Sequence, residues 1–429
     1  MFARAFYTTT LKPFLSKFIT IDLDYVISGS FWQIGRQVVN NLTSLVVAVL
    51  MARQLSQSAY GTYNYLMSVL GIVVLASLPG MNAAVTQASA KKEPNILLPA
   101  FWDKVKWSLL GSLATLALAI YYYFQNQPEL VFGLLVMALF FPIHFSPQLY
   151  EAFLHGKKRF KTTAIYESIF NIILCLLFVI TLQISSNPII FFAIYVITQS
   201  VLKLFFLYKT YQQFPAKDKT RPKTMIVYGR HLSVLNAVSI ISSQIDRILL
   251  FTFLGPAQLA IYSLGILPLE KVLLVFSNIT ALALPKFAEK TLGQIKLSLP
   301  RRIVELMVVG AFSVIVYWLL APPFFKIFFP KYISSITISQ LSMLALIFRL
   351  PALLLQAFGQ AKVTLFPKNF LYATSVIPQI FFILILYAAI FYFGLLGAIW
   401  ARVLIAAIVL VVGLFNWNYL IRIRSDNSL

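Results

Sequence analysis

Seven basic residues stand inside long apolar stretches of the sequence, and five of them are candidates for a binding site. A charge at bilayer depth costs at least ~2.5 to 3.5 kcal/mol, so such a residue faces protein or water and usually has a function. A guanidinium group can donate two parallel hydrogen bonds to one phosphate. The set predicts a cationic cavity for an anionic substrate, formed by Arg36, Arg230, Arg349, Arg402 and Lys271. For Arg230 and Arg402, snorkelling or a structural ion pair explains the charge equally well.

Two carboxylates occupy similar positions and are candidates for ion coupling. Asp246 precedes Arg247, and Glu270 precedes Lys271. A carboxylate at membrane depth can carry a proton or bind a sodium ion during transport. The alternative is that each acid only neutralises its basic neighbour, and this interpretation is preferred for Asp246. Glu270 is the better coupling candidate.

Motifs for catalysis and cofactor binding are missing from the sequence. It contains no glycine-rich phosphate loop ending in lysine, so no ATPase site is expected. The histidines His144, His155 and His231 lack acidic or histidine partners at the spacing of a metal site or a catalytic triad. The single cysteine, Cys175, lies in an apolar run. We therefore expect no cofactor, no metal site and no enzymatic activity.

Membrane-spanning helices must position these residues. The 429-residue chain is 60% hydrophobic and 11% charged, which leaves too few polar groups to cover a soluble globule. About 20 apolar residues in a helix cross a bilayer core. Asn187-Pro188 and Gly394 divide the two longest uncharged runs. The sequence thus predicts an all-α integral membrane protein with twelve spans, near residues 26–50, 60–84, 107–124, 130–154, 164–184, 188–208, 226–253, 259–284, 303–321, 334–358, 369–391 and 394–420.

Basic residues are distributed unequally between the two sides of these spans. If the N-terminus is cytoplasmic, 25 of the 35 Lys and Arg residues lie on the cytoplasmic side, and only Arg53, Lys326 and Lys331 lie in outer loops. This distribution follows the positive-inside rule and predicts that both termini are cytoplasmic. It also explains most of the net charge of +22 without a nucleic-acid partner.

The two halves of the sequence resemble each other. A shift of 199 residues aligns residues 55–63 (LSQSAYGTY) with residues 254–262 (LGPAQLAIY), and each segment joins the first two spans of a six-span half. We predict an N-terminal lobe at residues 1–208, a basic cytoplasmic linker at 209–224 and a C-terminal lobe at 225–429. Because six spans return the chain to the same side, a pseudo-two-fold axis along the membrane normal would relate the lobes around a central cavity.

Several short motifs together resemble one family of transporters. Residues 244–262 (QIDRILLFTFLGPAQLAIY) resemble the start of the second half of bacterial polysaccharide transporters, and residues 29–32 (GSFW), 52–53 (AR) and 60–63 (YGTY) resemble their first half. Residues 329–332 (FPKY) and 359–362 (GQAK) add to the resemblance. The chain is identified as a member of the O-antigen and exopolysaccharide flippase branch of the multidrug/oligosaccharidyl-lipid/polysaccharide (MOP) superfamily. It departs from the pattern at Ser56-Gln57, where the second half has Gly255-Pro256.

The resemblance implies a MATE-like fold in the cell inner membrane. It also implies a flippase that moves polyprenyl (undecaprenyl) pyrophosphate-linked oligosaccharide across the bilayer by alternating access, with a polysaccharide polymerase and glycosyltransferases as partners. Two alternatives stay open. A multidrug/cation antiporter of the same superfamily would need acids in the first-half cavity, where this sequence has Arg36. A lipid II flippase usually has two additional spans.

Overall fold

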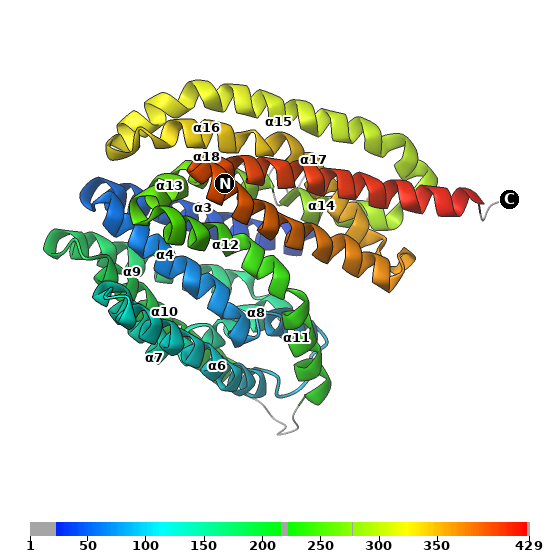
Figure 1. The fold of residues 1–429 in the computed structure, drawn as a ribbon. Helices are drawn as coiled ribbons and strands as arrows, with labels where there is room; N and C mark the ends of the chain where they lie inside the picture. Colours follow the sequence, from blue (N-terminus) through cyan, green and yellow to red (C-terminus); the bar gives the residue numbers. More distant parts are fainter. Residues whose placement is uncertain (1–22, 216–221, 277, 427–429) are drawn as a thin grey trace, which may run out of the picture. The chain divides into compact units, whose positions relative to one another are not determined.

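The computed structural model describes residues 23–215, 222–276 and 278–426, and this part of the chain is built from helices without a β-strand (Figure 1). Residues 216–221 of the predicted linker lie outside the described residues. A helix satisfies its backbone polar groups internally, as a segment in lipid must. Eleven helical stretches of the described chain are long and apolar enough to cross a membrane. The chain is therefore an all-α integral membrane protein.

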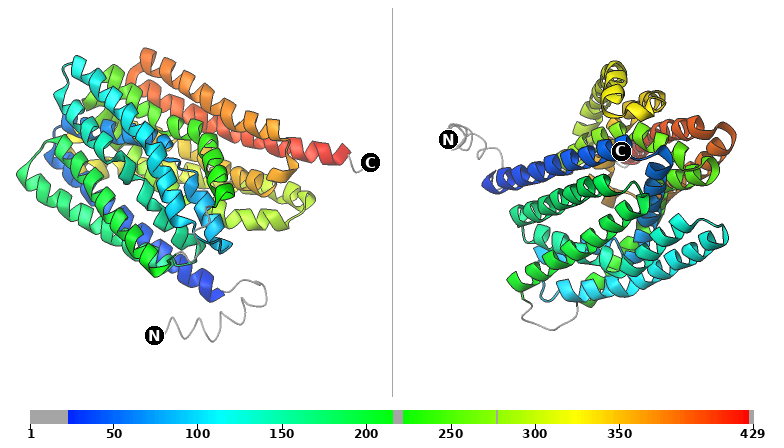
Figure 2. Two further views of the ribbon diagram at one scale, coloured as in Figure 1. Left: turned by 90° about the horizontal axis from the view of Figure 1, so that it is seen from below. Right: turned by 90° about the vertical axis from the view of Figure 1, so that its left-hand side faces the viewer.

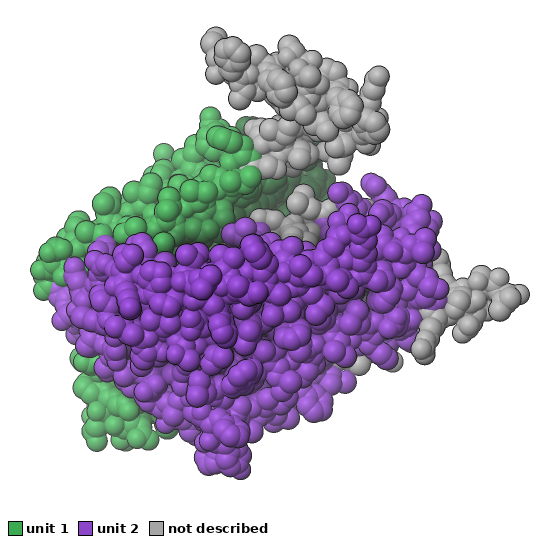
Figure 3. Space-filling view, turned by 90° about the horizontal axis from the view of Figure 1, so that it is seen from above, with its two compact units in different colours: residues 1–48, 74–184, 193–234 green, residues 49–73, 185–192, 235–429 purple. Residues whose placement is uncertain are grey.

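The chain divides into two compact units, coloured separately in Figure 3. Unit 1 comprises residues 1–48, 74–184 and 193–234. Its core contains Met81, Val85, Leu97, Tyr150 and Phe206, all buried. Its helical elements are α3 (Leu23–Gln54, up to Ala48), η2 (Val74–Ser77), α5 (Met81–Ala90), α6 (Leu97–Phe124), α7 (Pro128–His144), η3 (Ser146–Gln148), α8 (Leu149–Gly156), α9 (Phe160–Ile184), α10 (Pro188–Gln213, from Ala193) and α11 (Lys223–Leu235, up to Val234).

Unit 2 comprises residues 49–73, 185–192 and 235–429. Two buried clusters form its core, one around Leu269, Leu346 and Leu350 and one around Leu355 and Phe358. Besides the ends of α3 and α10, its elements are α4 (Gln57–Val73), α12 (Ala237–Leu254), α13 (Pro256–Phe276), α14 (Asn278–Glu289), α15 (Leu292–Phe328), η4 (Pro330–Tyr332), α16 (Ser335–Met343), α17 (Ala345–Ala361), η5 (Val363–Leu365) and α18 (Lys368–Asp426). The prediction of two six-helix lobes stays a prediction.

The last helical element, α18, is a hairpin of two arms. Gly394 has φ 57° and ψ −135°, a conformation that is essentially restricted to glycine. The chain folds back at this residue, and the two arms are in close contact beside the turn. A Cβ added to Gly397 would lie only 1.9 Å from the Ala389 carbonyl oxygen. Phe370 on the first arm stacks on Tyr419 on the second, with ring centroids 4.3 Å apart. The two arms are the orange and red helices that lie side by side in Figures 1 and 2.

The hairpin turns the 46-residue apolar stretch Val376–Ile421 into two membrane crossings. The described chain is therefore consistent with the twelve predicted spans. The predicted break at Asn187-Pro188 is confirmed, since α9 ends at Ile184 and α10 begins at Pro188.

Four predicted spans are interrupted among the described residues, namely those at 60–84, 130–154, 226–253 and 334–358. The span at 130–154 is broken at Phe145 between α7 and η3, and the span at 334–358 at Leu344 between α16 and α17. The stretch predicted at 226–253 consists of α11 and α12, with Asn236 between them. The stretch predicted at 60–84 ends at Ser77, because Leu78 has a positive φ of 55° and Pro79, which lacks a backbone N–H, follows it. The chain continues in α5, which belongs to unit 1. Hydropathy alone could not show the breaks at Asn236 and after Ser77, since the residues on both sides of each are apolar.

Long apolar stripes run along the outside of several helices. On α15 the exposed residues Val304, Val308, Phe312, Ile315 and Leu319 recur at the spacing of one helix face. Such a surface would be unstable in water, whereas lipid tails solvate it.

We predict that Gly394→Ala destabilises the protein. Alanine in this backbone conformation costs roughly 1–3 kcal/mol, and the hairpin would have to distort. The measurement is the temperature at which half of the detergent-purified protein loses its monodisperse peak in size-exclusion chromatography. The matched control is Gly359→Ala in α17, where no atom lies within 4 Å of the added Cβ and alanine favours the helix. Equal stability of both variants would contradict the strained turn.

Candidate functional site

Two arginines of unit 1 form ion pairs with carboxylates on distant helices. Arg36 of α3 pairs with Glu151 of α8. Arg230 of α11 pairs with Asp103 of α6 through two hydrogen bonds, with Nε and Oδ2 3.0 Å apart. Asp103 is almost fully buried, with 2% of its side chain exposed. For Arg230 the structure therefore shows the ion pair that was one of the two interpretations of the sequence.

The position of α11 in unit 1 depends on a close backbone contact. The Gly80 amide donates a hydrogen bond to the Ser233 hydroxyl at 3.0 Å. A Cβ on Gly80 would lie 2.4 Å from the Ser233 nitrogen. Only glycine allows this approach, which holds Arg230, three residues before Ser233, beside α6.

A third ion pair of unit 1 lies in the interior of the unit. Lys203 of α10 lies 3.1 and 3.2 Å from the two carboxylate oxygens of Glu167 of α9. The Tyr150 hydroxyl also donates to Glu167, and the Lys203 ammonium lies 4.9 Å from the ring centre of Phe170. The carboxylate is thus satisfied by a charge and a hydroxyl, as burial requires.

In unit 2, Asp246 is completely buried and binds Arg402. The Arg402 Nε lies 2.7 Å from Asp246 Oδ2, and the Tyr262 hydroxyl donates to the same carboxylate. The three residues join α12, α18 and α13. The ionic partner of Asp246 is therefore Arg402 on a distant part of the chain, and the neighbouring Arg247 contributes a backbone N–H at 2.9 Å.

Glu270 of α13 forms its ion pair with Arg247 of α12, at 2.7 Å. Arg247 also donates to the Gln244 side-chain oxygen at 3.2 Å. The Glu270 side chain stays 41% exposed, in contrast to the buried Asp246. Lys271, the next residue, is half-buried.

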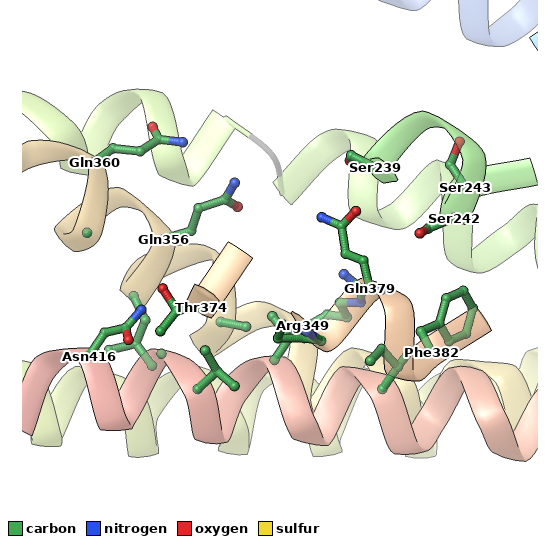
Figure 4. Close-up of a pocket in the computed structure, with 18 of the residues that line it drawn as sticks. Ser239, Ser242, Ser243, Arg349, Gln356, Gln360, Thr374, Gln379, Phe382 and Asn416 are labelled. Carbon is green, nitrogen blue, oxygen red and sulfur yellow. The ribbon is translucent and has the colours of Figure 1, made fainter. Parts of the chain in front are cut away.

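Arg349 of α17 differs from these cations, because no carboxylate of the described residues forms an ion pair with it. It lines a cavity of about 670 Å³ inside unit 2, shown in Figure 4. Helices α12 and α17 and both arms of α18 form the walls. The polar lining consists of Arg349, Ser239, Ser242, Ser243, Gln356, Gln360, Thr374, Gln379 and Asn416.

Several lining groups can still accept hydrogen bonds. The Gln379 Oε1 and Asn416 Oδ1 atoms are buried and have no hydrogen-bond partner in the described part of the chain. The Ser242 and Ser243 hydroxyls donate to backbone carbonyls at 2.7 Å, so their lone pairs remain as acceptors. An unsatisfied buried polar group costs about 1–3 kcal/mol. A ligand that supplies the missing partners would remove this cost.

The cavity therefore combines one cation with amides and hydroxyls. No carboxylate is among its lining residues. Among the described residues, no three His, Cys, Asp or Glu side chains come together as a metal site would require. The arrangement suits a ligand that carries both an anionic group and hydroxyls.

The cavity contains only one of the predicted site residues, Arg349. The predicted residues Arg402, Lys271, Glu270 and Asp246 lie in the same unit but do not line it, and Arg36 and Arg230 belong to unit 1. The uncharged lining residues were not predicted from the sequence. Their signal was polar residues at helical spacing inside apolar spans, at positions 239, 242 and 243 and at 356 and 360.

The sequence of the chain matches a known protein family. Residues 26–290 match the family model described as "Polysaccharide biosynthesis protein". No curated protein sequence matches the chain significantly.

Solved structures of MOP superfamily transporters share the fold. An inward-facing multidrug resistance MATE family transporter superposes with a TM-score of 0.62 at 16% identity, over 91% of this chain and 99% of that one. The lipid II flippase MurJ gives 0.63 at 14% identity, over 91% and 87%. A MOP superfamily transporter from Pyrococcus furiosus, whose structure is described by the reverse polarity of its binding pocket, gives 0.56 at 13% identity, over 92% and 96%. The fold is therefore MATE-like.

We predict that Asp246 and Arg402 stabilise the fold as a unit. Either Asp246→Asn or Arg402→Gln leaves a buried charge without its partner, which costs about 3–5 kcal/mol. The double variant should lose clearly less than the sum of the single losses. Thermal stability in detergent measures all three variants. Glu305→Gln in the exposed Arg301–Glu305 pair of α15 is the control and should change stability by at most ~0.5 kcal/mol. Additive losses in the double variant would disprove the coupling.

Proposed function

The chain belongs to the polysaccharide biosynthesis protein family, and from this membership we propose that it is a flippase for polyprenyl pyrophosphate-linked oligosaccharide in surface polysaccharide synthesis. The glycan would be an O-antigen, a capsule or an exopolysaccharide. The observation that carries the proposal is the unpaired Arg349 in a cavity lined with amides and hydroxyls. Glycosyltransferases would supply the substrate and a polymerase would use the product.

The charge of the cavity is opposite in sign to the pyrophosphate that has to move. A pyrophosphate cannot enter a low-dielectric interior without compensation, and Arg349 supplies a cation with up to five N–H donors. The interior-negative membrane potential favours outward movement of anions by ~2.3 kcal/mol per charge per 100 mV. Alternating access would then carry the head group through the protein while the lipid tail stays in the bilayer.

The same observation argues against a multidrug/cation antiporter. A cationic substrate needs an acidic partner, and the cavity lining has none. The carboxylates at Asp103, Glu151, Glu167, Asp246 and Glu270 are each engaged with a basic residue. A lipid II flippase is the second candidate, because the solved lipid II flippase MurJ shares the fold.

We assign the other predicted site residues secondary roles. Arg36, Arg230 and Arg402 would reach substrate only in a conformation in which their ion pairs have opened, and Lys271 stands beside Glu270. Glu270 is the more accessible coupling candidate, because its side chain is 41% exposed. Asp246, with no exposed surface, would couple only after Arg402 moves.

We also propose the arrangement in the membrane. The lobes at residues 1–208 and 225–429, joined by the linker at 209–224, would lie in the cell inner membrane with both termini in the cytoplasm.

The first functional prediction concerns Arg349. In proteoliposomes with a fluorescent polyprenyl pyrophosphate-linked oligosaccharide, Arg349→Ala should slow flipping by at least about tenfold, which corresponds to ~1.4 kcal/mol. Arg349→Lys should retain part of the rate, since an ammonium keeps the charge without the planar fork. The rate is read as the fraction of labelled lipid that becomes accessible to an external quencher.

The control is Arg302→Ala, which removes an exposed arginine of α15 that does not line the cavity. Full activity of Arg349→Ala would reject the site. Transport of lipid II, but not of other lipid-linked oligosaccharides, by the wild-type protein would favour the second candidate.

A second prediction concerns topology. Reporter fusions at Gln212 and Leu429 should indicate the cytoplasm, and a fusion at Gln127, in the turn between α6 and α7, should indicate the exterior. The physical reason is the excess of Lys and Arg in the loops assigned to the cytoplasm. An external signal from Gln212 would overturn both the topology and the parallel repeat.

A further inference from the structure

We infer that the cavity of unit 2 holds its substrate in one orientation, with the pyrophosphate at Arg349 and the first sugars along an amide row. The amide row consists of Gln356, Gln360 and Asn416 and lies at the end of the cavity next to the connection between α17 and α18. This inference rests on the proposed function and adds a sugar subsite to it.

The cavity is elongated along the helices that line it. Its lining on the second arm of α18 runs from Ile405 to Asn416, which is about 16 Å at a rise of 1.5 Å per residue. In Figure 4 the amide row and Thr374 lie at one end, the α12 serines and Phe382 lie at the other, and Arg349 lies between them. Arg349 and the amide row therefore occupy different parts of one space, while a fourth amide, Gln379, lies beside Arg349.

Packing between α17 and α18 fixes the amide row. A Cβ on Gly413 would lie 3.0 Å from the Leu355 Cβ, so these two residues face each other at close range. Gln356 follows Leu355 directly, and Asn416 lies about one helical turn beyond Gly413. The glycine brings the two helices together and thereby places the two amides at one level of the cavity.

Arg349 and the amide row differ in hydrogen-bonding chemistry, and the pyrophosphate and the sugars of the proposed substrate differ in a matching way. Arg349 only donates hydrogen bonds, which suits the oxygens of an ionised pyrophosphate. A carboxamide both donates and accepts, as a sugar hydroxyl does. The buried Asn416 Oδ1 lacks a partner and needs a donor, which an ionised phosphate does not offer. A sugar hydroxyl satisfies it.

This assignment gives Asn416 an effect on stability that is opposite to its effect on binding. Asn416→Leu removes a buried polar atom that has no partner in the free protein. The free protein should therefore keep or gain thermal stability, while the sugar-bearing ligand loses a hydrogen bond. A residue with a merely structural role would lose stability instead.

The experiment compares two ligands on the detergent-purified full chain. The probes are polyprenyl pyrophosphate without sugar and the same lipid carrying an oligosaccharide, and the readout is the dissociation constant. Asn416→Leu and Gln356→Leu should each weaken the sugar-bearing lipid about 3- to 10-fold and leave the sugar-free lipid unchanged. Arg349→Gln should weaken both. Gln258→Leu, an exposed amide of α13 outside the cavity, is the control and should change neither.

The outcomes separate this inference from the proposed function. If Asn416→Leu and Gln356→Leu weaken both lipids equally, or weaken neither, the sugar subsite is wrong while the flippase proposal stands. If the wild-type protein binds neither lipid, the proposed function fails and the subsite with it. A lower melting temperature of Asn416→Leu together with weaker binding of both lipids would assign Asn416 a structural role and overturn the inference.

Discussion

The structure depends on one constraint: a charge inside a membrane protein must either form an ion pair or serve to bind a ligand or an ion. Five carboxylates in the helices satisfy this constraint, because each forms an ion pair with a basic residue on another helix. These pairs tie α3 to α8, α6 to α11, α9 to α10, α12 to α18 and α12 to α13. Each removes an unpaired charge and also fixes which helices are neighbours. Arg349 forms no ion pair with a carboxylate of the described residues and lines the cavity, so it can meet a ligand.

The distribution of the pairs has a mechanical consequence. Every one of them lies within a single compact unit, so movement of either unit as a body would not have to break a buried ion pair. Breaking such a pair costs several kcal/mol, so a movement that keeps the pairs intact has a lower barrier than one that opens them. Internal ion pairs thus favour movement of whole helix groups, as in transporters that alternate access by rocking.

The sequence predicted the helical fold well, because the need to bury about 20 apolar residues per crossing is visible in composition alone. It also predicted the turn at Gly394, since one helix across that run would be too long. It did not predict the break at Asn236 or the end of the second helical stretch at Ser77, where the surrounding residues stay apolar. The helical stretch ends at Ser77 because of the positive φ of Leu78 and the missing N–H of Pro79, whereas no proline or glycine marks the break at Asn236.

The candidate site was predictable in part for the same reason. Arg349 stands out because a charge in a span is expensive, whereas uncharged amides such as Gln379 and Asn416 are also common in helix packing. The partner of each cation could not be read from spacing. Arg36 and Glu151 are 115 residues apart, and Arg402 and Asp246 are 156 apart. Only the folded chain shows that Arg36, Arg230 and Arg402 form ion pairs and that Arg349 forms none with a carboxylate of the described residues.

The engagement of the other arginines also bears on how a transporter must bind. A site that surrounded a pyrophosphate with four free guanidinium groups would hold it tightly and release it slowly, and transport requires both steps. In the proposed transport, one arginine without a carboxylate partner, supported by amides and hydroxyls, would attract the anion without holding it as tightly as four guanidinium groups. A carboxylate beside Arg349 would stabilise the free protein and compete with the substrate. Arg349 and the unsatisfied amide oxygens of Gln379 and Asn416 therefore destabilise the ligand-free protein. A ligand that satisfies these groups would be favoured, and it could still dissociate.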